Sequence, residues 1–543
     1  MADTRPNIPP PINDPIRSYA PGSPERARLK ARLAELSDAG TAVPLVIGGK
    51  RVGGTGMVPI RAPHRRELEV GEHAVGGTKE VDAAIKAALQ ARVGWAATPY
   101  VDRAAVFLRA AAMLAGPWRD TINAATMLGQ SKNVMQAEID AACELVDFLR
   151  YNVHYGDHIL RQQPVSDTVA WNRLEYRPLE GFVFVVSPFN FTSIAGNLPT
   201  AVALMGNTVV FKPSHETMLV CHFLMRMFEE AGLPPGVINM VSGDSAKIAE
   251  QVLARRELAG IHFTGSTAVF QSMWSKVGAN IAHYRTYPRL VGETGGKDFI
   301  FAHQSADVAS LTTALVRGAF EYQGQKCSAA SRAYIPKSMW KRMKKDITDQ
   351  VDSIDIGDVA DFRNFMGAVI NESAFKRHKA AIAEAKRSTK ADVVAGGDTD
   401  SRDGWFVRPT IIEASGPDYR TMRDELFGPI LTVYPYPDKE FDKTLEICDS
   451  TSPYGLTGAI FARDRAAVTA ASDRLVNAAG NFYVNDKPTG AVVGMQPFGG
   501  ARGSGTNDKA GSYLNLLRWV SPRTVKETYV PPTEYRYPHM AEE

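Results

Sequence analysis

Three side chains that lie far apart along the chain could together catalyse a reaction at a carbonyl carbon. Cys327 follows a helix predicted from Ser305 to Gly324, Glu293 lies among glycines, and Asn190 lies in a predicted loop. A thiolate is a nucleophile, a buried carboxylate can act as a general base, and an amide can donate to an oxyanion. Each residue alone also has a simpler interpretation, as an inert apolar cysteine, a turn carboxylate and a loop asparagine.

A second group of residues could bind a dinucleotide. Residues 181–186 and 208–211 are predicted strands joined by a helix at 192–205, and such a crossover makes the two strands parallel. Lys212 ends the second strand, where its ammonium could reach a ribose. Residues 265–267 begin another helix, whose backbone N–H groups could hold a phosphate. The alternatives are a solvated strand end and an ordinary helix start, because this turn is not a GxGxxG sequence.

The elements that position these groups alternate between strands and helices. A further unit has strands at 237–241 and 260–264 with a helix at 246–254. Repeated units of this kind predict an α/β fold with an open parallel sheet, whose ligand lies beyond the carboxyl ends of the strands. Glycines at 292–296 interrupt the pattern and a new series begins near Asp307, so we place the boundary between two large domains there.

Composition narrows the class of protein. The chain has 543 residues, of which 44% are hydrophobic and 22% charged, which is ordinary globular usage. The net charge of +3 argues against a nucleic-acid-binding face. Four cysteines without a CxxC pair predict a reducing compartment and no structural metal site. The proline-rich N-terminus lacks a signal or transit pattern, which favours a cytoplasmic enzyme. The uncharged stretch 181–211 contains prolines and asparagines, so we expect no membrane span.

In this order, the motifs resemble the aldehyde dehydrogenase superfamily across nearly the whole chain. The series is SPFNF at 187–191, FKPS at 211–214, FTGST at 263–267, GETGG at 292–296, GQKCS at 324–328, ELFGP at 425–429 and PFGG at 497–500. Longer segments, among them YQGQKCSA and QPFGGARGSGTNDKAG, resemble the 1-pyrroline-5-carboxylate dehydrogenase branch. The resemblance implies NAD-dependent oxidation of the small-molecule substrate L-glutamate γ-semialdehyde to glutamate in proline degradation.

The resemblance also implies a role for each motif. Cys327 is the implied nucleophile, Asn190 and the Cys327 backbone N–H form the oxyanion hole, and Glu293 activates the water that hydrolyses a thioester. The implied cofactor-binding residues are Ser187, Lys212, Gly265, Ser266, Thr267, Ala268, Val269, Glu425 and Phe427. The implied substrate-binding residues are Ser328, Gly490, Ala491 and Phe498.

The same resemblance implies three structural parts. These are a Rossmann-type NAD-binding domain at 1–160 and 180–290, an α/β catalytic domain at 291–490, and a β-flap for oligomerisation at 161–179 and 515–543, with 491–514 returning to the NAD-binding side. The implied assembly is a homodimer or a higher assembly of dimers.

Three positions depart from common forms of these motifs. Ala491 lacks a hydroxyl that relatives often carry, which predicts weaker carboxylate binding. Phe270 replaces a frequent glycine and His215 a frequent glutamate, so the preference for NAD over NADP rests on the branch. The alternatives are an NAD(P)-dependent dehydrogenase of another semialdehyde, a coenzyme A-acylating relative, which Glu293 disfavours, and a silent scaffold, which the retained Cys327 disfavours.

Overall fold

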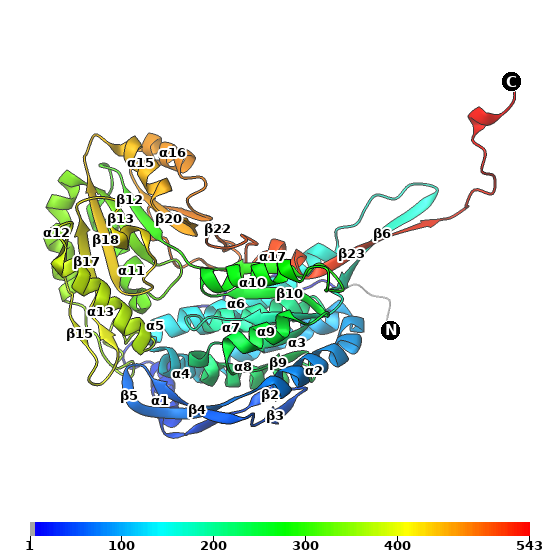
Figure 1. Ribbon diagram of the computed structural model, residues 1–543, viewed down its shortest axis with the longest axis horizontal. Coiled ribbons are helices and arrows are strands. Elements are labelled where there is room, and N and C mark those ends of the chain that lie inside the picture. Colours follow the sequence, from blue (N-terminus) through cyan, green and yellow to red (C-terminus); the bar gives the residue numbers. More distant parts are fainter. Residues whose placement is uncertain (1–5) are drawn as a thin grey trace.

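Two seven-stranded sheets, each covered by helices on both faces, form the body of the protein (Figure 1). The structure is a computed structural model that describes residues 6–543. The predicted α/β class is confirmed. The predicted irregular N-terminal segment, 1–22, is observed from residue 6 onward without helix or strand, and its first five residues lie outside the described part.

The first sheet has the strand order β11-β10-β7-β8-β9-β2-β3. Its strands are β2 (Leu45–Ile47), β3 (Lys50–Val52), β7 (Phe182–Val186), β8 (Thr208–Lys212), β9 (Ile238–Met240), β10 (Leu258–Thr264) and β11 (Arg289–Glu293). Strands β7 to β11 pair in parallel, as predicted for β7 and β8, while β2 and β3 form an antiparallel edge.

Strand β7 is apolar at every position because both faces of this sheet are covered. Phe182 and Phe184 pack on one face, and Val183 and Val185 on the other. The first face is covered by α2 (Thr78–Ala97), α9 (Ser245–Leu253) and α10 (Thr267–Ala279). The second is covered by α3 (Tyr100–Ala115), α4 (Arg119–Gln130), α6 (Glu144–Leu160), α7 (Thr192–Leu204) and α8 (Met218–Glu230).

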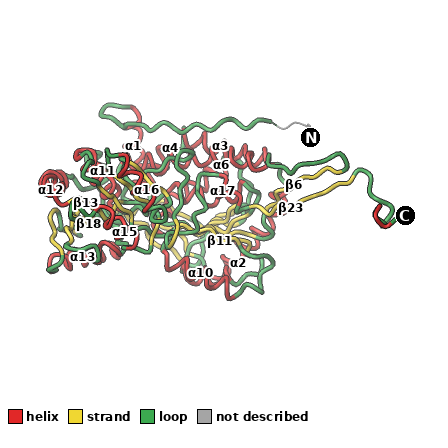
Figure 2. The backbone as a smooth tube through the Cα atoms, turned by 90° about the horizontal axis from the view of Figure 1, so that it is seen from above, coloured by secondary structure: helices red, strands yellow, loops and turns green. Residues whose placement is uncertain are grey.

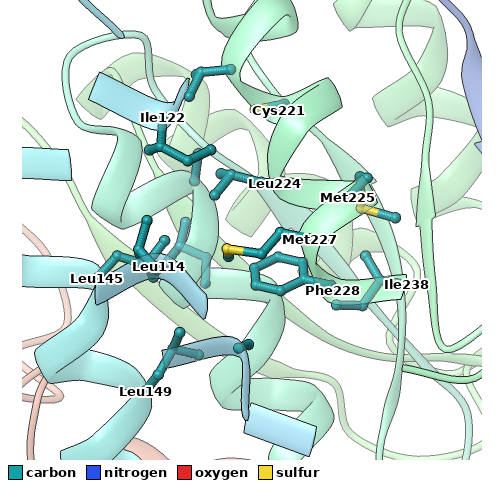
Figure 3. Packing of buried hydrophobic residues seen from close by; sticks show 14 of the residues in the cluster. Leu114, Ile122, Leu145, Leu149, Cys221, Leu224, Met225, Met227, Phe228 and Ile238 are labelled. Carbon is teal, nitrogen blue, oxygen red and sulfur yellow. The ribbon is translucent and has the colours of Figure 1, made fainter. Parts of the chain in front are cut away.

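The core on the second face also explains one cysteine. Figure 3 shows Cys221 on α8 among the buried side chains of Ile122 and Leu224. Cys143 and Cys448 are buried as well, whereas Cys327 is partly exposed. Exposure therefore distinguishes Cys327 from the other three thiols.

The second sheet has the order β14-β17-β18-β13-β12-β20-β21. Its strands are β12 (Asp298–Ala302), β13 (Ala330–Pro336), β14 (Ala391–Ala395), β17 (Thr410–Ala414), β18 (Ile430–Tyr436), β20 (Thr457–Phe461) and β21 (Asn481–Val484). All neighbours are parallel except β14 and β17. One face is covered by α11 (Val308–Phe320) and α12 (Lys337–Asp352), the other by α13 (Glu372–Arg387), α15 (Phe441–Ser450) and α16 (Arg465–Arg474).

A two-stranded antiparallel ribbon projects from the body (Figure 1). It consists of β6 (Ala170–Pro178) and β23 (Val520–Thr528), which lie in the two segments expected to form the β-flap, 161–179 and 515–543. The remaining elements are α1 (Pro24–Asp38), β1 (Thr41–Val43), β4 (Gly56–Ala62), β5 (Arg65–Val75), α5 (Val134–Ala137), the π-helix η1 (Glu138–Cys143), the 3₁₀ turns η2 (His215–Thr217), η3 (Glu321–Gly324) and η4 (Pro538–Met540), β15 (Thr399–Asp400), β16 (Phe406–Val407), α14 (Arg420–Arg423), β19 (Tyr454–Gly455), β22 (Ala501–Arg502) and α17 (Tyr513–Leu517).

Residues 6–22, which we call the N-terminal strap, run as an extended segment across α3, α4 and α6 before α1 begins (Figure 2). Ser23 caps α1 by accepting a hydrogen bond from the Arg26 backbone N–H. None of the helices within residues 6–543 combines the length and the apolar composition needed to cross a bilayer.

Candidate active site

Cys327 lies in a buried turn that connects α11 to β13, and we call residues 321–328 the nucleophile loop. The helix predicted to end at Gly324 ends earlier, at Phe320. Tyr322, Gln323 and Gly324 then adopt left-handed conformations, with φ of 51°, 55° and 65°. A Cβ at Gly324 would overlap the Gly428 carbonyl oxygen, so this position requires glycine.

Side-chain amides hold this unusual backbone in place. Gln323 Nε2 donates to the Ser131 and Ala368 carbonyl oxygens at 3.0 and 2.7 Å. Gln325 Oε1 accepts from the Ile370 backbone N–H at 2.9 Å. Left-handed conformations of non-glycine residues are costly, and they persist where the surroundings over-determine them. Buried hydrogen bonds therefore stabilise the unusual backbone conformation of the turn that carries Cys327.

Asn190 is buried beside the nucleophile loop, as its predicted role requires. Its Nδ2 donates to the Gln325 carbonyl oxygen at 3.1 Å. An amide nitrogen carries two N–H groups, so one N–H remains for another acceptor. The structure thus brings Asn190 within two residues of Cys327 along the loop.

Glu293 ends β11, and its carboxylate faces the PFGG segment. Its Oε2 accepts from the Gly500 backbone N–H at 3.3 Å. Burial raises the pKa of Glu293 well above its usual value, although the Gly500 N–H and Lys509 oppose the rise. Burial, together with Asp298 and Glu293, also raises the pKa of the Cys327 thiol well above its usual value. Burial therefore stabilises the neutral form of each group relative to its charged form.

A cavity of about 110 Å³ connects these residues to the predicted substrate positions. Its wall contains Glu293, Cys327, Ser328, Gly490, Ala491 and Phe498. The volume equals roughly that of four liquid water molecules, which suits a small substrate. We call residues 488–498 the substrate loop. Ser328 Oγ donates to Thr489 Oγ1 at 2.9 Å, which joins the nucleophile loop to the substrate loop.

The cavity wall also contains charged residues that sequence reasoning missed. Asp140 Oδ2 lies 2.7 Å from Lys132 Nζ and 3.4 Å from Lys326 Nζ. Glu144 accepts from Ser193 Oγ at 2.8 Å, and burial raises the pKa of Glu144 to about 8. Asp140 lies on the π-helix η1, a rare element that is frequent at functional sites. Of these charged residues, only Lys326 could have been suspected from the sequence, because it is adjacent to Cys327.

The predicted cofactor residues gather at the carboxyl ends of the first sheet. Ser187 follows β7 and Lys212 ends β8. The buried Ser187 Oγ has no hydrogen-bond partner within residues 6–543. Burial lowers the pKa of Lys212, because its ammonium is largely removed from solvent. An orphaned hydroxyl beside a buried ammonium fits a ribose or a phosphate.

The turn 265–269 lies at the start of α10, as predicted. Ser266 caps the helix by accepting from the Val269 N–H at 3.4 Å, and Thr267 Oγ1 accepts from Gly295 N at 3.3 Å. Phe270 lies inward and stacks on Phe263 with ring centroids 5.4 Å apart. The ring therefore fills space below the turn, and Gly265 to Val269 remain beside the strand ends.

Glu425 and Phe427 come from the second half of the molecule and meet the same region. Glu425 Oε1 accepts from Gly296 N at 2.8 Å, and burial raises the pKa of Glu425 to about 6. Phe427, with φ of 57°, packs edge-on against Phe189 at 5.7 Å. The backbone directly after Glu293 thus contacts Thr267 of the first half and Glu425 of the second half.

A cysteine on a glycine turn, an amide beside it and a carboxylate at the end of a Rossmann-type sheet define a class of enzyme. Residues 52–525 match the aldehyde dehydrogenase family. The chain belongs to this family.

Comparison with individual relatives and solved structures is more specific than the family match. The chain is 48% identical over 541 residues to a mitochondrial delta-1-pyrroline-5-carboxylate dehydrogenase of Dictyostelium discoideum, covering 99% of this chain and 97% of that protein. It is 47% identical to the mouse mitochondrial enzyme of that name over 529 residues, covering 97% and 94%. The crystal structure of the Mycobacterium tuberculosis delta-pyrroline-5-carboxylate dehydrogenase bound with NAD is 55% identical, covers 99% and 100%, and superimposes with a TM-score of 0.96.

Proposed function

We propose that this protein oxidises L-glutamate γ-semialdehyde, the open form of 1-pyrroline-5-carboxylate, to L-glutamate with NAD in proline degradation. The observation that carries the proposal is the single cavity that contains Cys327, Glu293 and the substrate loop. The near full-length similarity to named pyrroline-5-carboxylate dehydrogenases supports the same activity.

The first step is attack by Cys327. The thiol releases its proton to solvent, the sulfur bonds to the aldehyde carbon, and the carbonyl π electrons move to oxygen. The free N–H of Asn190 and the backbone N–H of Cys327 donate to the new oxyanion. Because the hydrogen bond from Asn190 to Gln325 already orients the amide, little reorganisation is needed.

Ser187, Lys212, the turn 265–269, Glu425 and Phe427 would hold the dinucleotide. When bound, NAD supplies a nicotinamide ring that accepts hydride from the thiohemiacetal carbon, which leaves a thioester on Cys327. The orphaned Ser187 Oγ and the buried Lys212 ammonium support binding of its ribose and phosphate groups.

Hydrolysis of the thioester completes the reaction. Glu293 takes a proton from water, the resulting hydroxide attacks the acyl carbon, and the Cys327 sulfur leaves as thiolate and is reprotonated. A general base works best when its pKa lies near the working pH, and burial moves the pKa of Glu293 in that direction.

The substrate loop provides selectivity. Gly490 has φ of 93° and lies with Ala491 and Ser328 on the cavity wall, where backbone N–H groups can bind an α-carboxylate. The Ser328 hydroxyl can donate to the same carboxylate when it turns away from Thr489. Phe498 supplies an apolar surface for the aliphatic stem. Because Ala491 lacks a hydroxyl, we expect one carboxylate contact fewer than in a serine-bearing relative.

Steady-state kinetics test the function. We expect kcat/KM for pyrroline-5-carboxylate to exceed that for propanal about ten- to hundredfold, since hydrogen bonds to a charged group contribute roughly 1.5–3 kcal/mol each. NAD should be preferred to NADP. Equal efficiency on propanal would favour a general aldehyde dehydrogenase. A requirement for coenzyme A would favour the acylating alternative.

The projecting flap, formed by β6 and β23, is the argument for the proposed homodimer or higher assembly of dimers. Trp171 of β6 is exposed, as are Val169 before β6 and Tyr529 after β23. An isolated two-stranded ribbon is marginally stable in water. Sedimentation of the purified chain tests this, and a monomer at micromolar concentration would contradict it. We assign domains 1–160 with 180–290, 291–490, and the flap 161–179 with 515–543.

A cytoplasmic location is proposed as well. The four cysteines are free in the structure, which is typical of a reducing compartment. Fractionation of the source cells with marker enzymes tests the location, and recovery of the protein with an organelle marker would overturn it.

A further inference from the structure

The substrate loop is tied to a residue 480 positions earlier in the chain. Asn13, in the N-terminal strap, donates from Nδ2 to the Val493 carbonyl oxygen at 2.9 Å. The Val493 side chain lines the cavity next to Ala491. This hydrogen bond therefore fixes a residue of the cavity wall through its backbone, from outside the cavity.

The Asn13 amide is itself held on both sides. Its Nδ2 also donates to Asp147 Oδ2 at 2.8 Å, and its Oδ1 accepts from the Tyr151 hydroxyl at 2.9 Å. Asp147 and Tyr151 both lie on α6. The adjacent Asp14 N–H donates to Asp147 Oδ1 at 2.7 Å. Asn13 is thus a bridge between a rigid helix and the substrate loop.

The shape of the loop fits this bridge. Gly494, which follows Val493, has φ of 84°, and a Cβ there would overlap the Tyr151 ring. The loop backbone therefore lies directly on the ring whose hydroxyl orients Asn13. Val493 thus accepts a hydrogen bond from Asn13, which Tyr151 orients, and the next residue, Gly494, packs against the Tyr151 ring itself.

The strap is firmly attached beside Asn13. Arg119, which is buried, forms ion pairs with Asp14 of the strap and with Glu138 of η1. Glu138 also accepts from the Arg17 N–H at 2.8 Å and from the Tyr19 hydroxyl at 2.9 Å. These contacts hold residues 13–19 of the strap against the helices that its backbone crosses in Figure 2. The strap is therefore a fixed support and not a loose terminus.

We propose that Asn13 is a positioning residue for substrate selection: it holds the Val493 carbonyl so that the neighbouring Gly490 and Ala491 keep the conformation that binds the α-carboxylate. This inference rests on the proposed function, because it assigns Asn13 to the carboxylate end of that substrate. Asn13 does not line the cavity and acts only through the loop.

Kinetics of Asn13→Ala on two aldehydes provide the test. We expect KM for the semialdehyde to rise about three- to tenfold, the range for one lost hydrogen bond, while kcat changes little. KM for propanal and for NAD should stay unchanged, because neither needs the carboxylate-binding loop. If Asn13 had only a structural role, the substitution would change the KM values for the semialdehyde, propanal and NAD together, or would change none of them. An equal rise for propanal, or an unchanged KM for the semialdehyde, overturns the proposal.

Two variants sharpen the interpretation. Asn13→Asp keeps the shape and the acceptor for Tyr151 but places a carboxylate against Asp147 and the Val493 carbonyl, so its effect should exceed that of Asn13→Ala. Asn7→Ala makes the same truncation at an exposed position of the same strap and should behave as wild type. Equal effects at Asn7 and Asn13 would assign the change to the strap in general and contradict the proposal.

A substrate-independent readout separates this inference from the proposed function. Amide hydrogen exchange of a peptide covering 490–498 should be faster in Asn13→Ala than in wild type, with α7 unchanged. If wild type prefers propanal, the proposed function fails, and unchanged exchange in the variant would then overturn the positioning role by itself. If wild type prefers the semialdehyde and the variant matches it, the positioning role alone fails.

Discussion

The nucleophile loop and the substrate loop line one cavity but are held in different ways. The nucleophile loop is buried, and its own side chains Gln323 and Gln325 bind backbone groups of Ser131, Ala368 and Ile370. The substrate loop is partly exposed, and Asn13 and Tyr151 hold it from distant parts of the chain. The difference is that the nucleophile loop holds its strained turn with its own side chains, whereas the substrate loop is held by side chains of other segments.

Replacing the nucleophile gives the largest expected effect. In Cys327→Ala, NADH formation from pyrroline-5-carboxylate should fall at least about a thousandfold, because no covalent intermediate can form. Both substrates should be affected equally. Cys448→Ala, at a buried thiol outside the cavity, is the matched control and should retain activity. Undiminished turnover in Cys327→Ala would remove this sulfur from the mechanism.

Glu293→Gln tests a group that belongs to neither loop. Loss of a general base costs roughly a hundred- to ten-thousandfold in kcat. Because only hydrolysis is impaired, a burst of about one NADH per subunit should remain, with an acyl adduct on Cys327 visible by mass spectrometry. The absence of any adduct in the trapped protein would contradict the thioester mechanism.

The same residue predicts a pH dependence. The base acts when deprotonated, and burial raises the pKa of Glu293, so wild-type kcat should increase with pH well above the usual range of a glutamate. Activity should be lost as the pH falls through that raised pKa. In Glu293→Gln this limb of the profile should disappear, and its persistence would assign the titration to another group.

A substitution that removes a hydrogen bond of the nucleophile loop should lower kcat for both substrates. Gln325→Ala removes the acceptor of the buried Ile370 N–H, a loss of roughly 1–3 kcal/mol, and we expect kcat to fall about tenfold for the semialdehyde and for propanal alike. This is the opposite signature to that of Asn13→Ala. A decrease in kcat for the semialdehyde alone would show that the nucleophile loop also determines substrate selectivity, and would contradict the comparison.

The smallest expected effect is a gain. Ala491→Ser adds a hydroxyl to the substrate loop and should lower KM for the semialdehyde about threefold, with no change for propanal. Val492→Thr adds a hydroxyl to the next residue, which does not line the cavity, and is the matched control. An equal change in both variants would mean that the carboxylate lies elsewhere.

The parallel strands of the first sheet were predictable because their physical cause is local. A strand covered on both faces is apolar, as β7 is at every position and β8 is at residues 209–211. The end of the helix before Cys327 was placed wrongly at Gly324. Glycine commonly ends helices, but here Tyr322 and Gln323 have already left the helix, and their conformation depends on contacts with Ser131 and Ala368.

The supports of the site were not predictable. The ion pair between Asp140 and Lys326 and the hydrogen bond between Asn13 and Val493 join residues that are remote in sequence. Lys326 lies in the GQKCS motif, but Asp140 and Asn13 lie in none of the motifs, and a π-helix has no sequence signature of its own. Motifs identify groups that touch substrate, whereas the residues that hold those groups are defined only by three-dimensional packing.

The ring of Phe270 has a consequence for protein engineering. A methyl group on Gly292 would occupy the volume that this ring already fills. Residue 270 of α10 and residue 292 of β11 therefore share one space, which only one of them can fill with a side chain. A small side chain at position 270 would leave a void beneath the cofactor turn. A graft of this turn into another member of the family should transfer both positions together.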